Sequence, residues 1–131
     1  MKAPSATILA IDAGTTGIHA LAFDGQLHPV AEAYEEFPQH FPFPGGVEHD
    51  AREILDAVDR VVEKVVSMVG TPRVIGVTNQ RETVFPLDVD SGETLSRGIV
   101  WQDRRTADRC EELRAAGHEE LVRQRTGLVL D

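Results

Sequence analysis

The sequence predicts an α/β fold with a mixed sheet, in which an antiparallel meander is followed by a strand–helix–strand unit and flanked by helices. Short apolar segments separated by tight-turn residues fill the first 36 positions, and a long segment with helical periodicity spans residues 51–69. A β-branched segment at residues 73–79 follows that helix. A helix between two strands usually returns the chain to a parallel neighbour in the same sheet.

The meander is predicted from three apolar segments, at residues 7–12, 18–24 and 28–36. Asp24-Gly25 lies between the second and third and is a strong hairpin signal. Strands at this spacing, joined by tight turns, are typical of antiparallel neighbours.

A loop rich in proline, glycine and phenylalanine is predicted over residues 37–49. Proline lacks an N–H donor, so no regular ladder can run through the segment. Its phenylalanines must pack on something, and two interpretations stay open. The loop is either an extension of the core or an element near a ligand or a partner domain.

The predicted helix over residues 51–69 begins after Asp50, a good N-cap, and Glu53 completes the pattern of a capping box. Apolar residues recur along it at three- and four-residue spacing, which gives one apolar face. Many of them are valine, whose intrinsic helix propensity is poor, so we expect docking on the sheet to stabilise the helix. Gly70 and Pro72 mark its end.

Shorter elements complete the chain. Residues 83–88 and 94–101 are predicted to be extended, with a turn between them at Asp90-Ser91-Gly92. A helix over about 104–116 is expected to be capped by Asp103, and a last one over about 118–125 to end at Gly127.

Composition excludes several classes of protein. A net charge of −9 argues against non-specific nucleic-acid binding, which depends on Lys and Arg. No apolar segment approaches the roughly 20 residues of a membrane span. The first residues do not suggest a secretory signal, because the apolar segment after them contains Asp12. The single cysteine, Cys110, rules out an intrachain disulfide, fits a cytoplasmic location and is predicted to be a buried small residue.

The segment from Ile8 to Gly17 carries the clearest chemical signal, an apolar strand that ends in Asp12 and a glycine–threonine turn. Small residues allow the backbone to turn tightly and present N–H groups to an anion. The hydroxyls of Thr15 and Thr16 offer further bonds to phosphate, and Asp12 is a ligand suited to Mg²⁺. An ordinary hairpin turn, with Asp12 bonded to turn amides, explains the same residues.

Further segments follow in a fixed order: Pro44 to Asp50, Gly76 to Thr83, Ile99 to Thr106 and Thr126 to Asp131. Together with Asp12-Ala13-Gly14-Thr15-Thr16, they resemble the N-terminal part of the FGGY carbohydrate kinases, and among these the glycerol kinases. The resemblance covers nearly the whole chain. It implies the actin-like, ribonuclease-H-like ATPase fold and transfer of the γ-phosphoryl group of ATP to a polyol or sugar hydroxyl.

The resemblance implies a nucleotide side of the site, with ATP and Mg²⁺ as cofactors. Asp12 would face the metal ion and the phosphates. The implied phosphate-binding residues are Gly14, Thr15, Thr16, Gly17 and His19. His19 stands where glycerol kinases usually have arginine, and Ala13 where they usually have glutamine. Because histidine is mostly neutral near pH 7, we expect weaker phosphate binding or a neighbouring polyol-kinase subgroup.

The resemblance also implies a polyol side, in which Arg81 and Glu82 bind hydroxyls and Trp101 forms an apolar wall. The chemistry agrees, since arginine supplies donors, an ionised glutamate supplies acceptors and an indole is flat and rigid. Adjacent residues of a strand point to opposite faces, so both can reach one ligand only if the backbone leaves the strand near Gln80. A solvated Arg81–Glu82 pair and a core tryptophan are the ordinary alternatives.

Four other residues are compared with the family pattern, and none of them is given a catalytic role. Phe43 and Gly46 replace a glutamine and a tryptophan that are common in the loop. Arg104 and Arg105 match the family and are interpreted as part of the start of a helix.

Enzymes of this family are far longer, with ATP in the cleft between two actin-like domains. We therefore expect residues 1–131 to be an incomplete N-terminal domain that is inactive alone, without the catalytic base. The implied partners are a small polyol and the missing C-terminal part, and exposed apolar surface leaves a homo-oligomer open. A non-catalytic sugar- or nucleotide-binding module and another actin-like ATPase remain as alternatives.

Overall fold

The computed structural model describes residues 8–131. Its main sheet has the strand order β3-β2-β1-β5. The strands are β1 (Ile8–Ala13), β2 (Gly17–Phe23), β3 (Pro29–Glu36) and β5 (Val74–Asn79). β2 is antiparallel to β1 and β3, whereas β5 is parallel to β1. This confirms the predicted meander and strand–helix–strand unit; the first residue of the strand predicted at 7–12 lies outside the described residues.

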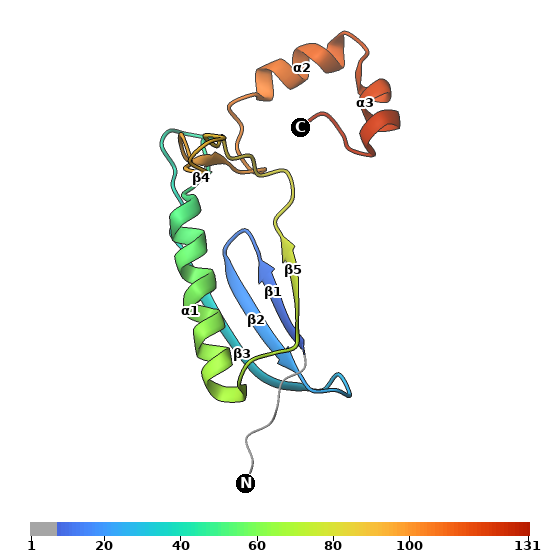
Figure 1. Ribbon diagram of the computed structural model, residues 1–131. Helices are drawn as coiled ribbons and strands as arrows, with labels where there is room; N and C mark the ends of the chain where they lie inside the picture. Colours follow the sequence, from blue (N-terminus) through green and yellow to red (C-terminus); the bar gives the residue numbers. More distant parts are fainter. Residues whose placement is uncertain (1–7) are drawn as a thin grey trace.

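One face of the sheet is covered by α1 (Ala51–Val69), which lies across β2 and β3 (Figure 1). Val61 and Val65 of the helix are at most 1% exposed, so docking on the sheet offsets the poor helix propensity of valine. The buried apolar cluster consists of Leu9, Ile11, Ile18, Ala20, Ala22, Ala33, Phe37, Ala57, Val61, Val65 and Val69.

The start of α1 differs from the predicted capping box. The side chain of Asp50 accepts a hydrogen bond from the Arg52 N–H at 2.9 Å, as an N-cap should. The carboxylate of Glu53 instead bonds to His40 Nε2 at 2.7 Å. His40, from the loop before α1, thus bonds to the Glu53 carboxylate that a capping box would use. Gly70, with φ of 80°, ends the helix as predicted.

Beyond α1 a small sheet joins β4 (Glu48–His49) to β6 (Gly98–Ile99) in antiparallel fashion. The extended segments predicted at 83–88 and 94–101 pair much less than expected. Apart from the pairing of β6 with β4, these segments form only two isolated bridges among the described residues, Val84–Ile99 and Leu87–Thr94. A two-stranded ribbon is marginally stable without a third strand or a covering helix, which explains the short ladder.

The last helices are α2 (Ala107–Ala115) and α3 (Glu119–Thr126), which extend beyond the sheet at the end where β5 finishes (Figure 1). The prediction that Asp103 caps a helix starting at 104 is wrong, because α2 begins only at Ala107, after Thr106. The Asp103 carboxylate accepts hydrogen bonds from the N–H groups of Val47 and Arg105 ahead of the helix. Cys110 is half-buried rather than buried, because α2 has no buried residue. None of the helices in residues 8–131 combines the length and apolar character that crossing a membrane requires.

Leu9→Ala should lower the free energy of unfolding by about 2–5 kcal/mol, the usual cost of a cavity left by a buried leucine. Leu9 is 1% exposed between the sheet and α1, whereas Leu55 on the outer face of α1 is 60% exposed. Urea unfolding followed by circular dichroism measures the change. Leu55→Ala is the control and should cost well under half as much; equal costs would place the core elsewhere.

Candidate functional site

The turn between β1 and β2 is tight because glycine occupies both of its ends. The Gly14 N–H donates to the Gly17 carbonyl at 3.0 Å. A Cβ on Gly17 would lie 2.6 Å from both the Glu35 carbonyl oxygen and the Tyr34 hydroxyl, so only glycine lets β2 approach β3 here. The turn is therefore a hairpin in its geometry, and its use for phosphate stays a prediction.

A second turn follows β5 and lies beside the first. The Gln80 N–H donates to the Ala13 carbonyl at 2.8 Å, which ties the end of β5 to the end of β1. The chain then leaves the strand, and Glu82 adopts a left-handed φ of 58°. Such a conformation is uncommon and costly for a residue other than glycine. The condition for Arg81 and Glu82 to reach one ligand, a departure of the backbone from the strand near Gln80, is therefore met.

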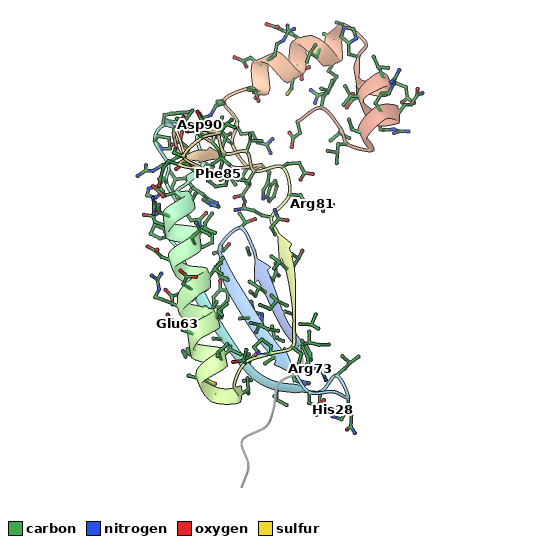
Figure 2. All side chains as sticks on the ribbon, in the orientation of Figure 1. His28, Glu63, Arg73, Arg81, Phe85 and Asp90 are labelled. Atoms are coloured by element: carbon green, nitrogen blue, oxygen red, sulfur yellow. The ribbon has the colours of Figure 1, made fainter. Side chains whose placement is uncertain are left out.

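The two turns share one cavity of about 370 Å³. Its lining residues are Thr15, Asn79, Gln80, Arg81, Glu82 and Trp101. The structure thus brings together one residue of the predicted phosphate loop and all three residues of the predicted polyol side. Figure 2 labels Arg81 at the end of β5.

The side chains in this cavity are accessible from solvent. The Trp101 indole Nε1–H donates to Thr15 Oγ1 at 3.1 Å, and the residue is 49% exposed, so it is not a core tryptophan. Arg81 and Glu82 form neither an ion pair nor a side-chain hydrogen bond among residues 8–131. A planar apolar wall, a guanidinium and a carboxylate therefore surround one space, a set that suits a small molecule with several hydroxyls.

Asp12 and His19 lie in a neighbouring cavity of about 300 Å³. They are in register with each other on β1 and β2, and Asp12 is also in register with Thr78 on β5. Leu9 and Ile11 alternate with Asp12 along β1 and are buried towards α1, so Asp12 stands on the opposite, open face. Gly14, Thr16 and Gly17 line neither cavity.

The open face offers one clear metal ligand. The Asp12 carboxylate makes no hydrogen bond within the described part of the chain and is exposed. No group of three or more His, Cys, Asp or Glu side chains suited to a metal occurs in residues 8–131. This donor set fits Mg²⁺, which usually takes one or two protein carboxylates and completes its shell with water and phosphate oxygens.

His19 is already engaged by β3. Its Nε2 lies 3.2 Å from Glu32 Oε2, and its ring meets Tyr34 edge-on at 6.1 Å. A phosphate group would have to share this imidazole with a carboxylate, which disfavours an anion.

A partly buried ionic cluster follows Trp101 in the chain. Asp103, whose side chain is 1% exposed, accepts the Val47 N–H at 2.7 Å and bonds to the Arg105 guanidinium, which also binds Glu48. The same guanidinium lies 5.2 Å from the centre of the Phe43 ring. Arg105 therefore joins the loop before α1 to the segment after Trp101, in agreement with a structural role.

The unusual pair in this loop is mutually compatible. A Cβ on Gly46 would lie 2.8 Å from the Phe43 ring. The phenyl ring thus occupies the space beside Gly46 that a larger side chain would need.

Asp103→Asn should lower the unfolding free energy at pH 7 by about 2 kcal/mol, because a buried charge-assisted hydrogen-bond network loses its anion. The Arg105 guanidinium holds the pKa of Asp103 well below its usual range, with further help from backbone N–H groups. A depressed carboxyl pKa stabilises the folded state above the unfolded pKa, near 3.9, and this stabilisation is lost as the pH falls through the folded pKa.

Unfolding free energies measured by urea titration between pH 7 and pH 2 check this prediction. The difference between wild type and Asp103→Asn should shrink as the pH falls below about 4. A difference that stays constant across that range would show that the charge of Asp103 is irrelevant. Asp59→Asn, on the exposed side of α1, is the control.

Three residues near this site were not predicted from the sequence. Asn79 and Gln80 line the first cavity, and their place beside Arg81 in one segment was the available signal. His49 is fully buried and bonds to Gln80, and no sequence signal separates it from an ordinary core histidine.

Comparisons with known proteins identify the family of this chain. The N-terminal domain of the FGGY family of carbohydrate kinases matches residues 7–131. Glycerol kinase of Alkalilimnicola ehrlichii is 49% identical over 128 residues, covering 95% of this chain but 26% of its own length. The chain thus spans about a quarter of the length of such relatives.

Solved structures show the same fold. Gluconate kinase from Lactobacillus acidophilus matches 94% of the chain and 25% of its own with a TM-score of 0.88 at 23% identity. Glycerol kinase from Plasmodium falciparum, solved with ADP, matches 100% of this chain and 27% of its own with a TM-score of 0.85 at 28% identity. The fold is therefore that of the actin-like sugar kinases, and the chain belongs to the FGGY family of carbohydrate kinases.

Proposed function

We propose that residues 1–131 form an incomplete N-terminal domain of an ATP-dependent kinase that phosphorylates a hydroxyl of glycerol or a related polyol or sugar. The single observation that carries this proposal is the cavity shared by Thr15, Arg81, Glu82 and Trp101. The names of the relatives and the ADP in the Plasmodium falciparum structure support it. Such an enzyme would act in the cytoplasm, where ATP is abundant.

On the polyol side of the site, each of three residues makes a different kind of contact with the substrate. Arg81 donates to hydroxyl oxygens and Glu82 accepts from hydroxyl protons, so together they can hold neighbouring hydroxyls of one polyol. The Trp101 face covers the carbon chain, and its bond to Thr15 fixes the ring beside the first turn. These contacts orient the substrate, which is a large part of what a kinase contributes to phosphoryl transfer.

The nucleotide side is assigned to the adjacent open face. Asp12 would hold Mg²⁺ directly or through water, and the turn from Gly14 to Gly17 would lie along the phosphates of ATP. Bound Mg²⁺ supplies neutralisation of the charge that the phosphates carry. His19 would approach the same phosphates, more weakly than an arginine because of Glu32.

The rest of the kinase is the main proposed partner. In the described sheet β5 is an edge strand, and Val74, Ile75 and Val77 on it are more than half exposed. An apolar strand edge pairs readily with further chain. We assign this edge to the C-terminal remainder of the enzyme, with a homo-oligomer as the alternative occupant.

The test is a coupled assay for glycerol phosphate with ATP, Mg²⁺ and glycerol. The complete gene product should turn over glycerol, and residues 1–131 alone should form none, because phosphoryl transfer needs groups from both sides of the cleft. Sustained turnover by the short chain, or polyol-independent ATP hydrolysis by the complete product, would contradict the proposal.

A further inference from the structure

A buried histidine lies behind the turn that carries Arg81 and Glu82. His49, the second residue of β4, is 0% exposed. Its Nε2 bonds to Gln39 Oε1 at 2.6 Å, and its Nδ1 bonds to the Gln80 side-chain amide at 2.9 Å. The ring therefore connects the loop before α1 to the residue that precedes Arg81.

The direction of every bond in this series follows from one carbonyl group. The amide nitrogen of Gln39 donates to the Phe37 carbonyl at 3.3 Å, so its oxygen faces His49 and accepts the Nε2–H. The Nδ1 atom is then an acceptor, and Gln80 must donate to it. The Gln80 oxygen in turn accepts from the Thr83 hydroxyl at 3.1 Å.

The surroundings keep the imidazole neutral. The Phe37 ring stands perpendicular to it, with centroids 4.9 Å apart. Burial lowers the pKa of His49, and the neighbouring His40 adds to the effect. A neutral ring can accept at Nδ1, whereas a protonated ring would present a second N–H to the amide of Gln80.

Gln80 is anchored at both ends of the turn. Its backbone N–H bonds to Ala13, and its side chain spans the turn to Thr83. Arg81 and Glu82 lie between these anchors, and Glu82 has the left-handed φ of 58°. A strained conformation of this kind persists only where the surrounding structure fixes it.

We propose that His49 is a positioning residue for polyol binding, which acts through Gln80 to hold the Arg81–Glu82 turn in its binding orientation. The inference rests on the proposed function, because it takes this turn as the polyol-binding element. His49 itself does not line the cavity and touches no substrate.

Two substitutions at the same position separate positioning from general stability. His49→Gln places an amide near the Nε2 position, so it can still donate to Gln39 but offers Gln80 no acceptor. His49→Asn places an oxygen near the Nδ1 position, so it can still accept from Gln80 but cannot reach Gln39. In the complete kinase, His49→Gln should raise the KM for glycerol about tenfold, the loss of one good hydrogen bond, with the KM for ATP unchanged.

His49→Asn should raise the KM for glycerol by less than about threefold, because the bond to Gln80 survives. Leu9→Ala, destabilised but remote from the site, controls for lost stability and should leave the KM for glycerol within about twofold of wild type. Equal effects of the two His49 variants would overturn the proposal. If neither folds, Gln80→Met removes the same bond from its other partner, together with the bond from Thr83, and should raise the KM for glycerol at least tenfold. A smaller increase would also overturn the proposal.

Nuclear magnetic resonance of the 131-residue chain gives a second readout that needs no kinase activity. The ¹⁵N spectrum should show His49 with a protonated Nε2 and an unprotonated Nδ1, and a proton on Nδ1 would overturn the proposal. His49→Gln should displace the backbone amide signals of Arg81 and Glu82 more than His49→Asn does. If the complete protein does not phosphorylate glycerol, the proposed function fails, while these spectra still decide whether His49 positions the turn.

Discussion

Arg81→Ala in the complete kinase should raise the KM for glycerol by about 10- to 150-fold, because charge-assisted hydrogen bonds to the polyol contribute about 1.5–3 kcal/mol. Arg81 lines the shared cavity and its guanidinium is engaged by no other described side chain, so its donors are available to a ligand. The KM for ATP should change little, since Asp12 and His19 occupy the neighbouring cavity. Steady-state kinetics with glycerol and ATP varied in turn measures both constants.

The matched control for this prediction is Arg73→Ala. Arg73 precedes β5 and Arg81 follows it, so the two arginines stand at opposite ends of one strand (Figure 2). Removing either takes one positive charge from beside an end of β5, but only Arg81 lines the cavity. Similar glycerol kinetics in the two variants would show that Arg81 is not a substrate ligand.

The order of elements could be predicted from the sequence because it depends on local patterns. The spacing of apolar residues in α1 and the hairpin signal at Asp24-Gly25 report the backbone directly, and both appear in the structure. The errors occur where a distant partner competes for a side chain. Glu53 bonds to His40 instead of completing the capping box, and Asp103 bonds to Val47, which lies 56 positions away, instead of capping α2.

In the site, too, local features could be predicted from the sequence and contacts between distant residues could not. The segment Arg81-Glu82 and the need for a break near Gln80 were available from residue types and strand geometry. Which segments meet was not, since the contact of Trp101 with Thr15 joins positions 86 residues apart. The role of His49 could not be predicted for the same reason. It depends on hydrogen bonds to Gln39 and Gln80, and neither partner can be identified from the sequence around His49.

The two cavities place the proposed functions of the site on two sides of the β1 end. Thr15 and the Arg81–Glu82 turn lie at the tip of β1 and β5, while Asp12 lies one step back on the open face. The bond from Gln80 to Ala13 locks these strand ends together. A polyol at the tip and a phosphate on the open face would therefore be held by neighbouring positions of one rigid sheet, which suits a transfer that depends on alignment.

From this separation we expect Asp12 to affect chiefly kcat, whereas Arg81 affects chiefly the KM for glycerol. Asp12→Asn in the complete kinase should lower kcat by about 100-fold or more, since a metal ion contributes several kcal/mol of charge stabilisation in phosphoryl transfer. The amide keeps the shape of the side chain but loses the negative charge that Mg²⁺ prefers. The KM for glycerol should stay within about threefold of wild type, because no contact of the polyol is removed.

Varying Mg²⁺ sharpens this second prediction. Weaker metal binding should shift the Mg²⁺ dependence of the Asp12→Asn enzyme to higher concentration, while Arg81→Ala should leave it in place. Asp59→Asn removes a carboxylate from the exposed side of α1, away from both cavities, and should leave kcat and the Mg²⁺ dependence unchanged. Full activity of Asp12→Asn at low Mg²⁺ would mean that the open face beside β1 is not where the metal binds, and the nucleotide side of the proposed site would have to be moved.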